Sequence, residues 1–254
     1  MSQPRETVRL ISLGCPKNLV DSEVMLGLLQ EKGWIPTPED KADVVIINTC
    51  SFIREAQEES VETILTIAAA KERGECQRLV VTGCLPQRYG EELLKELPEV
   101  DLFLGTGELH QIADLLEKSA KGELFQKQFI GPPTYLYDHR TPRIFTTTPG
   151  SVYIKIAEGC SNRCSYCVIP QIRGKFRSRM MSSVLLEVEQ AVSRGVKEIN
   201  LIAQDVTAYG RDLGDSTDLV RLLQSLVRIE GLRWIRLLYT HPAHITPDLI
   251  GLMR

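Results

Sequence analysis

Three cysteines in one loop have the residue type and the spacing needed to bind a metal centre. Cys160, Cys164 and Cys167 form a C-x₃-C-x₂-C pattern. A structural zinc site needs a fourth ligand, and the four histidines, at positions 110, 139, 241 and 244, all lie far away in the sequence. Three thiolates can instead hold three corners of a [4Fe–4S] cubane, since cysteine thiolates are the ligands of iron–sulfur clusters. The pattern favours such a cluster over zinc, with the fourth iron open to a substrate or cofactor.

Three earlier cysteines stand after predicted strands. Cys15, Cys50 and Cys84 each lie between the carboxyl end of a strand and the next helix. In an open parallel sheet these positions line one edge, where ligands bind, and helix N-termini nearby favour the thiolate form. The three thiols can therefore converge on a second site, or they can be unligated core cysteines. Cys76 lies in a turn before the third strand, outside this pattern, and we expect it to be unligated.

Continuous apolar strands alternate with helices through the first half of the chain. Strands are predicted at residues 8–14, 42–49, 78–83 and 100–105, and helices at residues 18–33, 54–74, 87–97 and 108–120, with Gly33 placed to end the first helix. Such alternation indicates an α/β fold with an open parallel sheet covered by helices on both faces.

The second half repeats the alternation after an interruption. Residues 121–150 contain four prolines, which exclude a long helix and indicate a linker or a short hairpin. Strands are then predicted at 151–157, 198–204 and 234–240, and helices at 184–195, 217–231 and 245–254, with Ser182 or Ser183 as a helix cap. The later cysteine loop follows the first of these strands, where a barrel of parallel strands carries its chemistry.

Composition limits the class of protein and its compartment. The 254 residues are 43% hydrophobic and 25% charged, as in soluble globular proteins. No apolar run approaches the ~20 residues needed to cross a bilayer, and the N-terminus "MSQPRETVRL" lacks the features of a signal peptide. We therefore expect a cytoplasmic protein with no membrane partner, in which seven cysteines indicate metal or catalytic roles rather than disulfides.

The formal charge of −3 is divided unevenly along the chain. Residues 1–120 contain 12 Lys or Arg and 21 Asp or Glu, a charge of −9, whereas residues 121–254 contain 18 and 12, a charge of +6. The acidic half suits a cationic partner and the basic half an anionic cofactor or nucleic acid, unless both are ordinary solvated surfaces.

The cysteine motifs resemble those of a known family. "GCSNRCSYC" resembles the cluster loop of radical S-adenosylmethionine enzymes, including the aromatic residue before the last cysteine. "SLGCPKNLVDSE", "NTCSF" and "VTGCLPQ" resemble the N-terminal domain of methylthiotransferases. This resemblance implies a methylthiotransferase N-terminal domain at 1–120, a linker at 121–150, and the first part of a partial (β/α)₆ radical S-adenosylmethionine barrel at 151–254.

The resemblance also implies two [4Fe–4S] clusters and S-adenosylmethionine as cofactors. Cys160, Cys164 and Cys167 would hold the cluster that chelates and cleaves S-adenosylmethionine to a 5′-deoxyadenosyl radical. The cluster on the other three cysteines (Cys15, Cys50 and Cys84) would supply or hold the sulfur, and a second S-adenosylmethionine would supply the methyl group. The radical is needed because an aliphatic C–H bond is far too weak an acid for side-chain acid–base chemistry, so the cofactor carries the hard step.

Shorter motifs indicate the substrate. "GCPKNLVDSE", "QDVTAYG" and "LLYTHPAHI" resemble the branch that methylthiolates an aspartate β-carbon in small ribosomal subunit protein twelve. The tRNA adenosine branch, typically with "GCQMN" and "GQN", is the first alternative. A non-catalytic iron–sulfur electron carrier and a zinc-stapled structural protein are alternatives from other classes.

The expected partners are the ribosomal protein, a sulfur donor, and an electron donor such as a reductase, flavodoxin or ferredoxin. We count three barrel strands after residue 150, where the family has six, and the family's small C-terminal β-domain has no counterpart. The sequence is therefore expected to be a fragment of a longer enzyme, and the fragment by itself is not expected to be active.

Four basic residues follow the cysteine loop in "RGKFRSR": Arg173, Lys175, Arg177 and Arg179. They are predicted to pair with a carboxylate of the cofactor or the target aspartate, or to form a solvated basic turn. Arg173 is the one we assign to cofactor binding.

Three further side chains are candidates for cofactor contacts. Tyr166 can stack near the cofactor or simply pack. Gln204 and Asp205 follow a predicted strand at the active face and can bind ribose hydroxyls, or can make a helix cap or loop bond. For His241 and His244, packing within the loop around Pro242 is the favoured interpretation.

Overall fold

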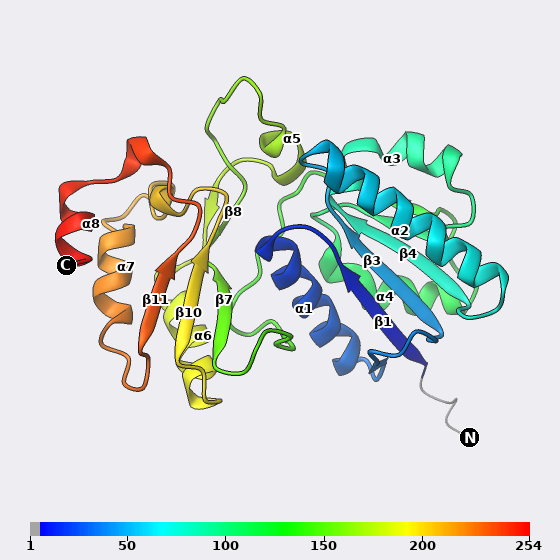
Figure 1. Cartoon of the computed structure of the whole chain (residues 1–254), viewed down its shortest axis with the longest axis horizontal. Helices are drawn as coiled ribbons and strands as arrows, with labels where there is room; N and C mark the ends of the chain where they lie inside the picture. Colours follow the sequence, from blue (N-terminus) through cyan, green and yellow to red (C-terminus); the bar gives the residue numbers. More distant parts are fainter. Residues whose placement is uncertain (1–5) are drawn as a thin grey trace. The chain divides into compact units, whose positions relative to one another are not determined.

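A computed structural model describes residues 6–254 (Figure 1). The chain divides into two compact units. The first comprises the residues up to Tyr135 together with the short segments Pro142–Ile144 and Gln171–Arg173. The second comprises Leu136–Thr141, Phe145–Pro170 and Gly174–Arg254.

The first unit is built on a six-stranded sheet in the order β2-β1-β3-β4-β5-β6. Every neighbouring pair in this sheet is parallel, which confirms the predicted open parallel sheet. Its strands are β1 (Thr7–Ser12), β2 (Ile35–Pro36), β3 (Val44–Thr49), β4 (Arg78–Gly83), β5 (Leu102–Leu104) and β6 (Gln128–Phe129).

Helices cover both faces of this sheet (Figure 1). They are α1 (Pro16–Glu31), α2 (Arg54–Glu72), α3 (Cys84–Glu96), η1 (Leu109–Gln111) and α4 (Ile112–Ala120). All six residues of β3 are buried, as expected for a strand covered on both sides. Val45 and Ile47 share a core cluster with Ile64 of α2 and Leu85 of α3. Since side chains alternate along a strand, the intervening residues of β3 face the side that α1 and α4 cover.

The two edge strands are short and were not predicted from the sequence. β2 has two residues, one of them a proline, which is compatible with an edge position. β6 comes from the proline-containing segment 121–150 and pairs in parallel with β5, through Phe103 opposite Gln128. The segment thus completes the first sheet instead of forming a hairpin of its own.

The second unit contains a parallel three-stranded sheet in the order β11-β10-β7 and a separate antiparallel pair, β8-β9. These strands are β7 (Ser151–Lys155), β8 (Ala157–Glu158), β9 (Arg177–Ser178), β10 (Glu198–Ile202) and β11 (Trp234–Leu237). The remaining helical elements are α5 (Ile169–Arg173), α6 (Met181–Ser193), η2 (Val206–Ala208), α7 (Leu219–Leu226), η3 (Pro242–His244) and α8 (Pro247–Leu252). Ile154, Ile199 and Leu201 of the sheet share a core with Val188 of α6 and Leu222 of α7.

The predicted serine cap of α6 is wrong. The helix begins at Met181, after Met180, and its first turn has no side-chain cap. Ser183 is buried inside that turn, where its hydroxyl accepts a hydrogen bond from Arg179 Nη2 at 2.9 Å. The Ser183 hydroxyl is therefore bonded to buried Arg179 and does not cap the N-terminus of α6.

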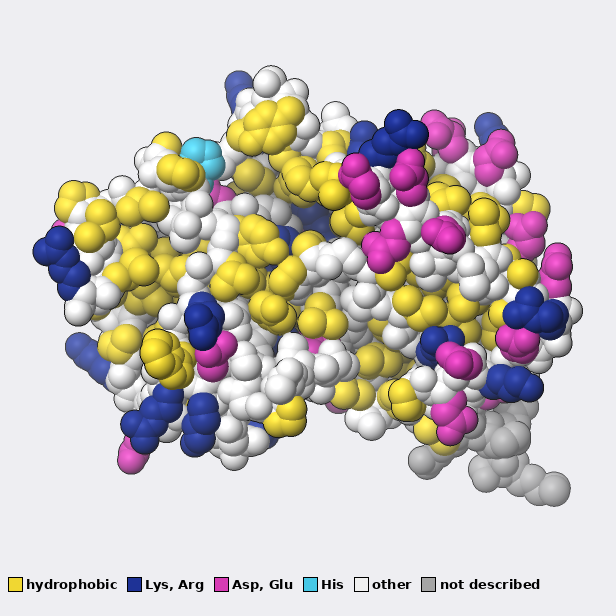
Figure 2. All heavy atoms as spheres, viewed as in Figure 1, with side chains coloured by type: hydrophobic (Ala, Val, Ile, Leu, Met, Phe, Trp, Pro, Cys, Tyr) yellow, Lys and Arg dark blue, Asp and Glu magenta, His cyan; other side chains and the backbone are white. Residues whose placement is uncertain are grey.

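The acidic excess of the first half appears on the surface. Figure 2 shows acidic side chains gathered over the start of α2, where the exposed residues include Glu55, Glu58, Glu59 and Glu62. Within residues 6–254, no helix is both long and apolar enough to cross a membrane.

Candidate iron–sulfur sites

The first three cysteines lie at the carboxyl edge of the first sheet. Cys15 precedes α1 with an extended backbone, Cys50 directly follows β3, and Cys84 opens α3 after β4. A methyl group built on Gly14 would lie 2.6 Å from Cys50 Cβ and 2.9 Å from Cys50 Sγ. The loop carrying Cys15 therefore passes directly against Cys50, and Gly14, with φ of +85°, leaves the space.

Burial dominates the acidity of Cys84 and Cys50. Burial, with smaller contributions from Cys15 and Cys50, raises the pKa of Cys84 to about 11 against the opposing effect of Arg173. Burial also raises the pKa of Cys50. The expectation that helix N-termini would favour free thiolates is wrong for these two residues. A bound cation would have to displace their protons, as metal binding to cysteine does.

Asn18 ties two of the cysteine loops together. Its Nδ2 donates to the backbone carbonyl of Leu13 at 3.1 Å and to that of Thr49, directly before Cys50, at 2.8 Å. Asn48 Nδ2 in turn donates to the Asn18 carbonyl at 2.8 Å. Asn18 is fully buried, so these bonds fix the spacing of the two loops. Asn18 stands in the "GCPKN" motif but was not among the predicted site residues.

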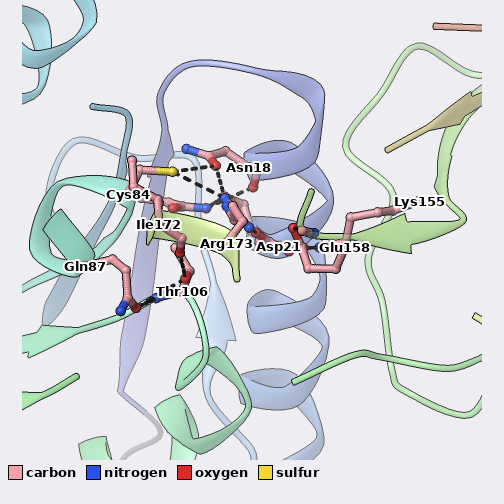
Figure 3. A network of polar contacts seen from close by, with 12 residues as sticks. Asn18, Asp21, Cys84, Gln87, Thr106, Lys155, Glu158, Ile172 and Arg173 are labelled. Carbon is pink, nitrogen blue, oxygen red and sulfur yellow. Dashed lines mark hydrogen bonds and ion pairs between the residues drawn. The ribbon is translucent and has the colours of Figure 1, made fainter. Parts of the chain in front are cut away.

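Arg173 completes this cluster (Figure 3). Its Nη1 donates to Asp21 Oδ2 at 2.6 Å, and its Nη2 donates to Asn18 Oδ1 and to Cys84 Sγ, the latter at 3.5 Å. The arginine is only 3% exposed. The carboxylate that it pairs with here is Asp21 of the chain itself, and Asp21 was not among the predicted site residues.

The later cysteine loop lies between β8 and α5. The Cys160 amide donates to the Gly174 carbonyl at 3.0 Å, and the pairing of β8 with β9 closes the base of the loop. Burial raises the pKa of Cys160, and Asp205, Cys167 and Cys164 raise it further. All three thiols are partly exposed. The loop thus presents three thiols that are near enough to influence one another.

Gln204 and Glu158 meet beside this loop. Gln204 Nε2 donates to Glu158 Oε1 at 2.6 Å, and Glu158 Oε2 pairs with Lys155 Nζ at 2.6 Å. Gln204 Oε1 is buried and has no hydrogen-bond partner among the described residues. A buried acceptor of this kind is costly unless something donates to it.

Asp205 connects the loops that follow three strands. Its carboxylate accepts from Asn162 Nδ2 at 3.1 Å in the cysteine loop, from the Thr207 hydroxyl, and pairs with His244 Nδ1 at 2.8 Å. Burial raises the pKa of Asp205, but these hydrogen bonds outweigh it and leave the pKa lowered. His241 accepts from the Ala243 amide within its own loop and stacks on His244.

The remaining predicted residues are placed as follows. Tyr166 is 84% exposed and does not pack into the described structure. The alternative prediction of a solvated basic turn agrees with Lys175, which is exposed. It is wrong for Arg179, which is buried and pairs with Glu187. Arg177 is half-buried and donates to the Lys175 carbonyl at 2.6 Å. Cys76 lies in the core cluster of the first sheet.

Among the described residues, no group of three or more Cys, His, Asp or Glu side chains is arranged to hold one metal ion. The fit to a cluster rests instead on donor type and placement. Each triad offers three thiols from loops at the end of a strand, and a cubane takes one cysteine on each of three different irons. The residues present therefore fit two such clusters.

Family comparisons agree with this architecture. Residues 7–105 match the uncharacterized protein family UPF0004, and residues 154–254 match the radical SAM superfamily. The second of these matches contains the cysteine loop between β8 and α5. Relatives that match almost the whole chain are named as methylthiotransferases.

Curated relatives of the chain carry the name ribosomal protein uS12 methylthiotransferase RimO. The protein of Geotalea uraniireducens is 55% identical over 252 residues, and that of Geobacter sulfurreducens is 54% identical over 252 residues. Each match covers 98% of this chain and 56% of the relative. The chain thus spans about 56% of the length of the curated relatives it matches.

Solved structures with a similar fold include that of the radical S-adenosylmethionine methyltransferase TsrM from Kitasatospora setae, with cobalamin and a [4Fe–4S] cluster bound. The TM-score is 0.65 at 15% sequence identity, over 98% of this chain and 57% of the other. At this identity the likeness bears on the fold alone.

Proposed function

We propose that this chain is part of a radical S-adenosylmethionine methylthiotransferase, which adds a methylthio group to the β-carbon of an aspartate in ribosomal protein uS12. The observation that carries the proposal is the pair of thiol triads, one at the carboxyl edge of the first parallel sheet and one in the loop between β8 and α5. The names of relatives more than 50% identical to the chain indicate the substrate. In this proposal residues 1–120 belong to the methylthiotransferase N-terminal domain, whose sheet β6 of the segment 121–150 extends, and residues 151–254 form the radical core.

The two triads have different roles in this proposal. One [4Fe–4S] cluster would be held beside S-adenosylmethionine by Cys160, Cys164 and Cys167. The cluster on the earlier triad would supply or hold the sulfur that is transferred. When bound and reduced, the first of these clusters supplies the electron that cleaves S-adenosylmethionine and so yields the radical that removes hydrogen from the substrate. The thiols must lose their protons to bind iron, so loading of both sites releases protons.

The chain's own polar groups then position the cofactor. Gln204 Oε1 is a buried acceptor suited to a ribose hydroxyl. Asp205 holds the cysteine loop through Asn162, which keeps the loop in place while its cysteines bind iron. Tyr166, exposed next to Cys167, is available to stack on the cofactor.

The partners follow from this chemistry. A reductase, flavodoxin or ferredoxin supplies electrons, a separate donor supplies sulfur, and the reaction takes place in the cytoplasm. The acidic surface over α2 is suited to a cationic partner.

Anaerobic reconstitution with iron and sulfide tests the two-cluster assignment. The chain should bind about eight irons, and alanine at Cys160, Cys164 and Cys167 should remove about four of them. Alanine at the earlier triad should remove the other four, whereas Cys76→Ala should remove none. Retention of all the iron by either triple variant contradicts the assignment.

The substrate is tested in cells that carry the full-length gene, by mass spectrometry of uS12 and of tRNA. Methylthiolated uS12 that disappears when the gene is deleted supports the proposal. A methylthio group found on tRNA adenosine, with none on uS12, favours the other branch of the family. Two clusters without reductive cleavage of S-adenosylmethionine would indicate an electron carrier.

A further inference from the structure

The guanidinium of Arg173 contacts one of the proposed cluster ligands. Nη2 lies 3.5 Å from Cys84 Sγ, within the distance of a hydrogen bond to sulfur, while Nη1 is held by Asp21 at 2.6 Å (Figure 3). Arg173, Asp21 and Cys84 are all less than 10% exposed. Water therefore competes little with this contact, and electrostatic effects act strongly at such a site.

The contact becomes stronger when Cys84 is a ligand. As a thiol, Cys84 can donate to Asn18 Oδ1, which lies 3.7 Å from its sulfur. An iron-bound thiolate has no proton and can only accept. Arg173 always carries its charge and only donates, so its bond to a thiolate is charge-assisted.

Backbone contacts hold the arginine in this position. The Thr106 hydroxyl donates to the carbonyl of Ile172, the residue before Arg173, at 2.7 Å. Thr106 is itself fixed, because its amide donates to Gln87 Oε1 at 2.8 Å. The guanidinium is thus already held in position before any cluster binds, so cluster binding need not order the Arg173 side chain.

We propose that Arg173 is a positioning residue of the earlier site, where its hydrogen bond to Cys84 Sγ raises the reduction potential of the cluster on Cys15, Cys50 and Cys84. This inference rests on the proposed function, in that it requires a cluster on this triad. Reduction adds one negative charge to the cluster, and a donor to a ligand sulfur stabilises the more negative state. Hydrogen bonds to the sulfurs are among the factors that set the potentials of iron–sulfur clusters.

Arg143 provides a matched control. It also comes from outside the first 135 residues, and it also pairs with an acidic residue of α1, Glu23, at 2.6 Å. Its side chain is 4% exposed, close to the value for Arg173. The hydrogen bonds of Cys84 Sγ described above are made with Asn18 and Arg173, so replacing Arg143 should leave this sulfur unaffected.

The experiment uses the whole chain with Cys160, Cys164 and Cys167 replaced by alanine, so that only the earlier triad can bind a cluster. This parent and its Arg173→Gln, Arg173→Lys and Arg143→Lys derivatives are reconstituted anaerobically and their iron is counted. Each is then titrated with the reductant dithionite at measured solution potentials, while the one-electron-reduced cluster is followed by electron paramagnetic resonance. The readout is a potential and does not depend on turnover.

Arg173→Gln should make the cluster at least about tenfold harder to reduce, a shift of about 59 mV to lower potential for a one-electron couple. Arg173→Lys should shift the potential in the same direction by less, because an ammonium keeps the charge but lacks the planar fork. Arg143→Lys should match the parent. If Arg173→Gln fails to fold, Arg173→Lys still provides the comparison.

The outcomes separate the inference from the proposed function. A parent that binds no iron overturns the cluster assignment and this inference with it. A parent with about four irons, and Arg173 variants with the same iron and the same potential, overturns the inference alone. An equal shift in Arg143→Lys also overturns it, because the effect would then come from losing any buried arginine.

Discussion

The side-chain amide of Asn18 donates a hydrogen bond to the backbone carbonyl of Thr49, 31 residues later, at 2.8 Å. Thr49 ends β3 and directly precedes Cys50, whereas Asn18 lies in the first turn of α1, three residues after Cys15. One buried amide therefore spans two loops that the proposed cluster requires at a fixed distance.

Asn18→Ala should destabilise the chain and reduce iron binding at the earlier triad. The substitution leaves the carbonyls of Leu13 and Thr49 without this donor, at a cost of about 1–3 kcal/mol for each buried group left unsatisfied. Thermal melts and iron counts of the reconstituted chain measure the two effects. Gln30→Ala, at an exposed position of the same helix, should change neither quantity. Full iron binding by Asn18→Ala would show that the hydrogen bonds of Asn18 do not set the distance between the two cysteine loops.

Gly14→Ala should destabilise the chain more than Gly33→Ala. Both glycines have positive φ, +85° and +91°, so each substitution carries backbone strain of about 1–2 kcal/mol. Only at Gly14 does the new methyl group also collide with a neighbour, at 2.6 Å from Cys50 Cβ; at Gly33 nothing lies within 4 Å. Gly14→Ala should in addition lose iron from the earlier triad, whereas Gly33→Ala should keep it. Equal losses of stability and of iron in the two variants would contradict this view of the Cys50 loop.

Gln204→Leu should weaken S-adenosylmethionine binding to the reconstituted chain by roughly tenfold. A typical hydrogen bond contributes about 0.5–1.5 kcal/mol, and the buried Oε1 of Gln204 is the acceptor that we assign to a ribose hydroxyl. Isothermal titration calorimetry under anaerobic conditions measures the affinity. Gln190→Leu, on the exposed face of α6, is the control and should bind like the unmodified chain. An unchanged affinity for Gln204→Leu would remove this residue from the cofactor site.

The stability contributed by Asp43 should depend on pH. The amide and the hydroxyl of Thr7 both donate to Asp43 Oδ2 at 2.7 Å and lower the pKa of this carboxyl. A lowered pKa in the folded state gives stability that is present above the unfolded value of about 3.9. This stability is lost as the pH falls through the folded value.

Asp43→Asn should therefore be less stable than the unmodified chain at pH 7, and the difference should shrink as the pH falls below about 4. Urea melts at a series of pH values give the two free energies of unfolding. A difference that stays constant with pH would mean that Asp43 contributes through packing rather than through its charge.

The sequence by itself determined the longer strands and helices and the place of each thiol after a strand. Buried parallel strands such as β3 read as unbroken apolar runs because both of their faces are covered. The placement of Cys15, Cys50 and Cys84 after strands followed from that reading, since parallel strands present their carboxyl ends at one edge. Short edge strands such as β2 and β6 have two residues each, too few to show a periodic pattern.

Only the tertiary structure decided which polar groups surround the thiols. Asn18, Asp21 and Arg173 meet at Cys84 although up to 155 residues separate them in the chain. Local patterns report which face of an element is apolar, but they do not report which distant side chain will supply a hydrogen bond. Burial is likewise a property of the folded chain, and it raises the pKa of Cys84 where the helix N-terminus alone suggested the opposite. The sequence therefore indicated cysteine thiols as the cluster ligands, whereas long-range packing determined the electrostatic environment of those thiols.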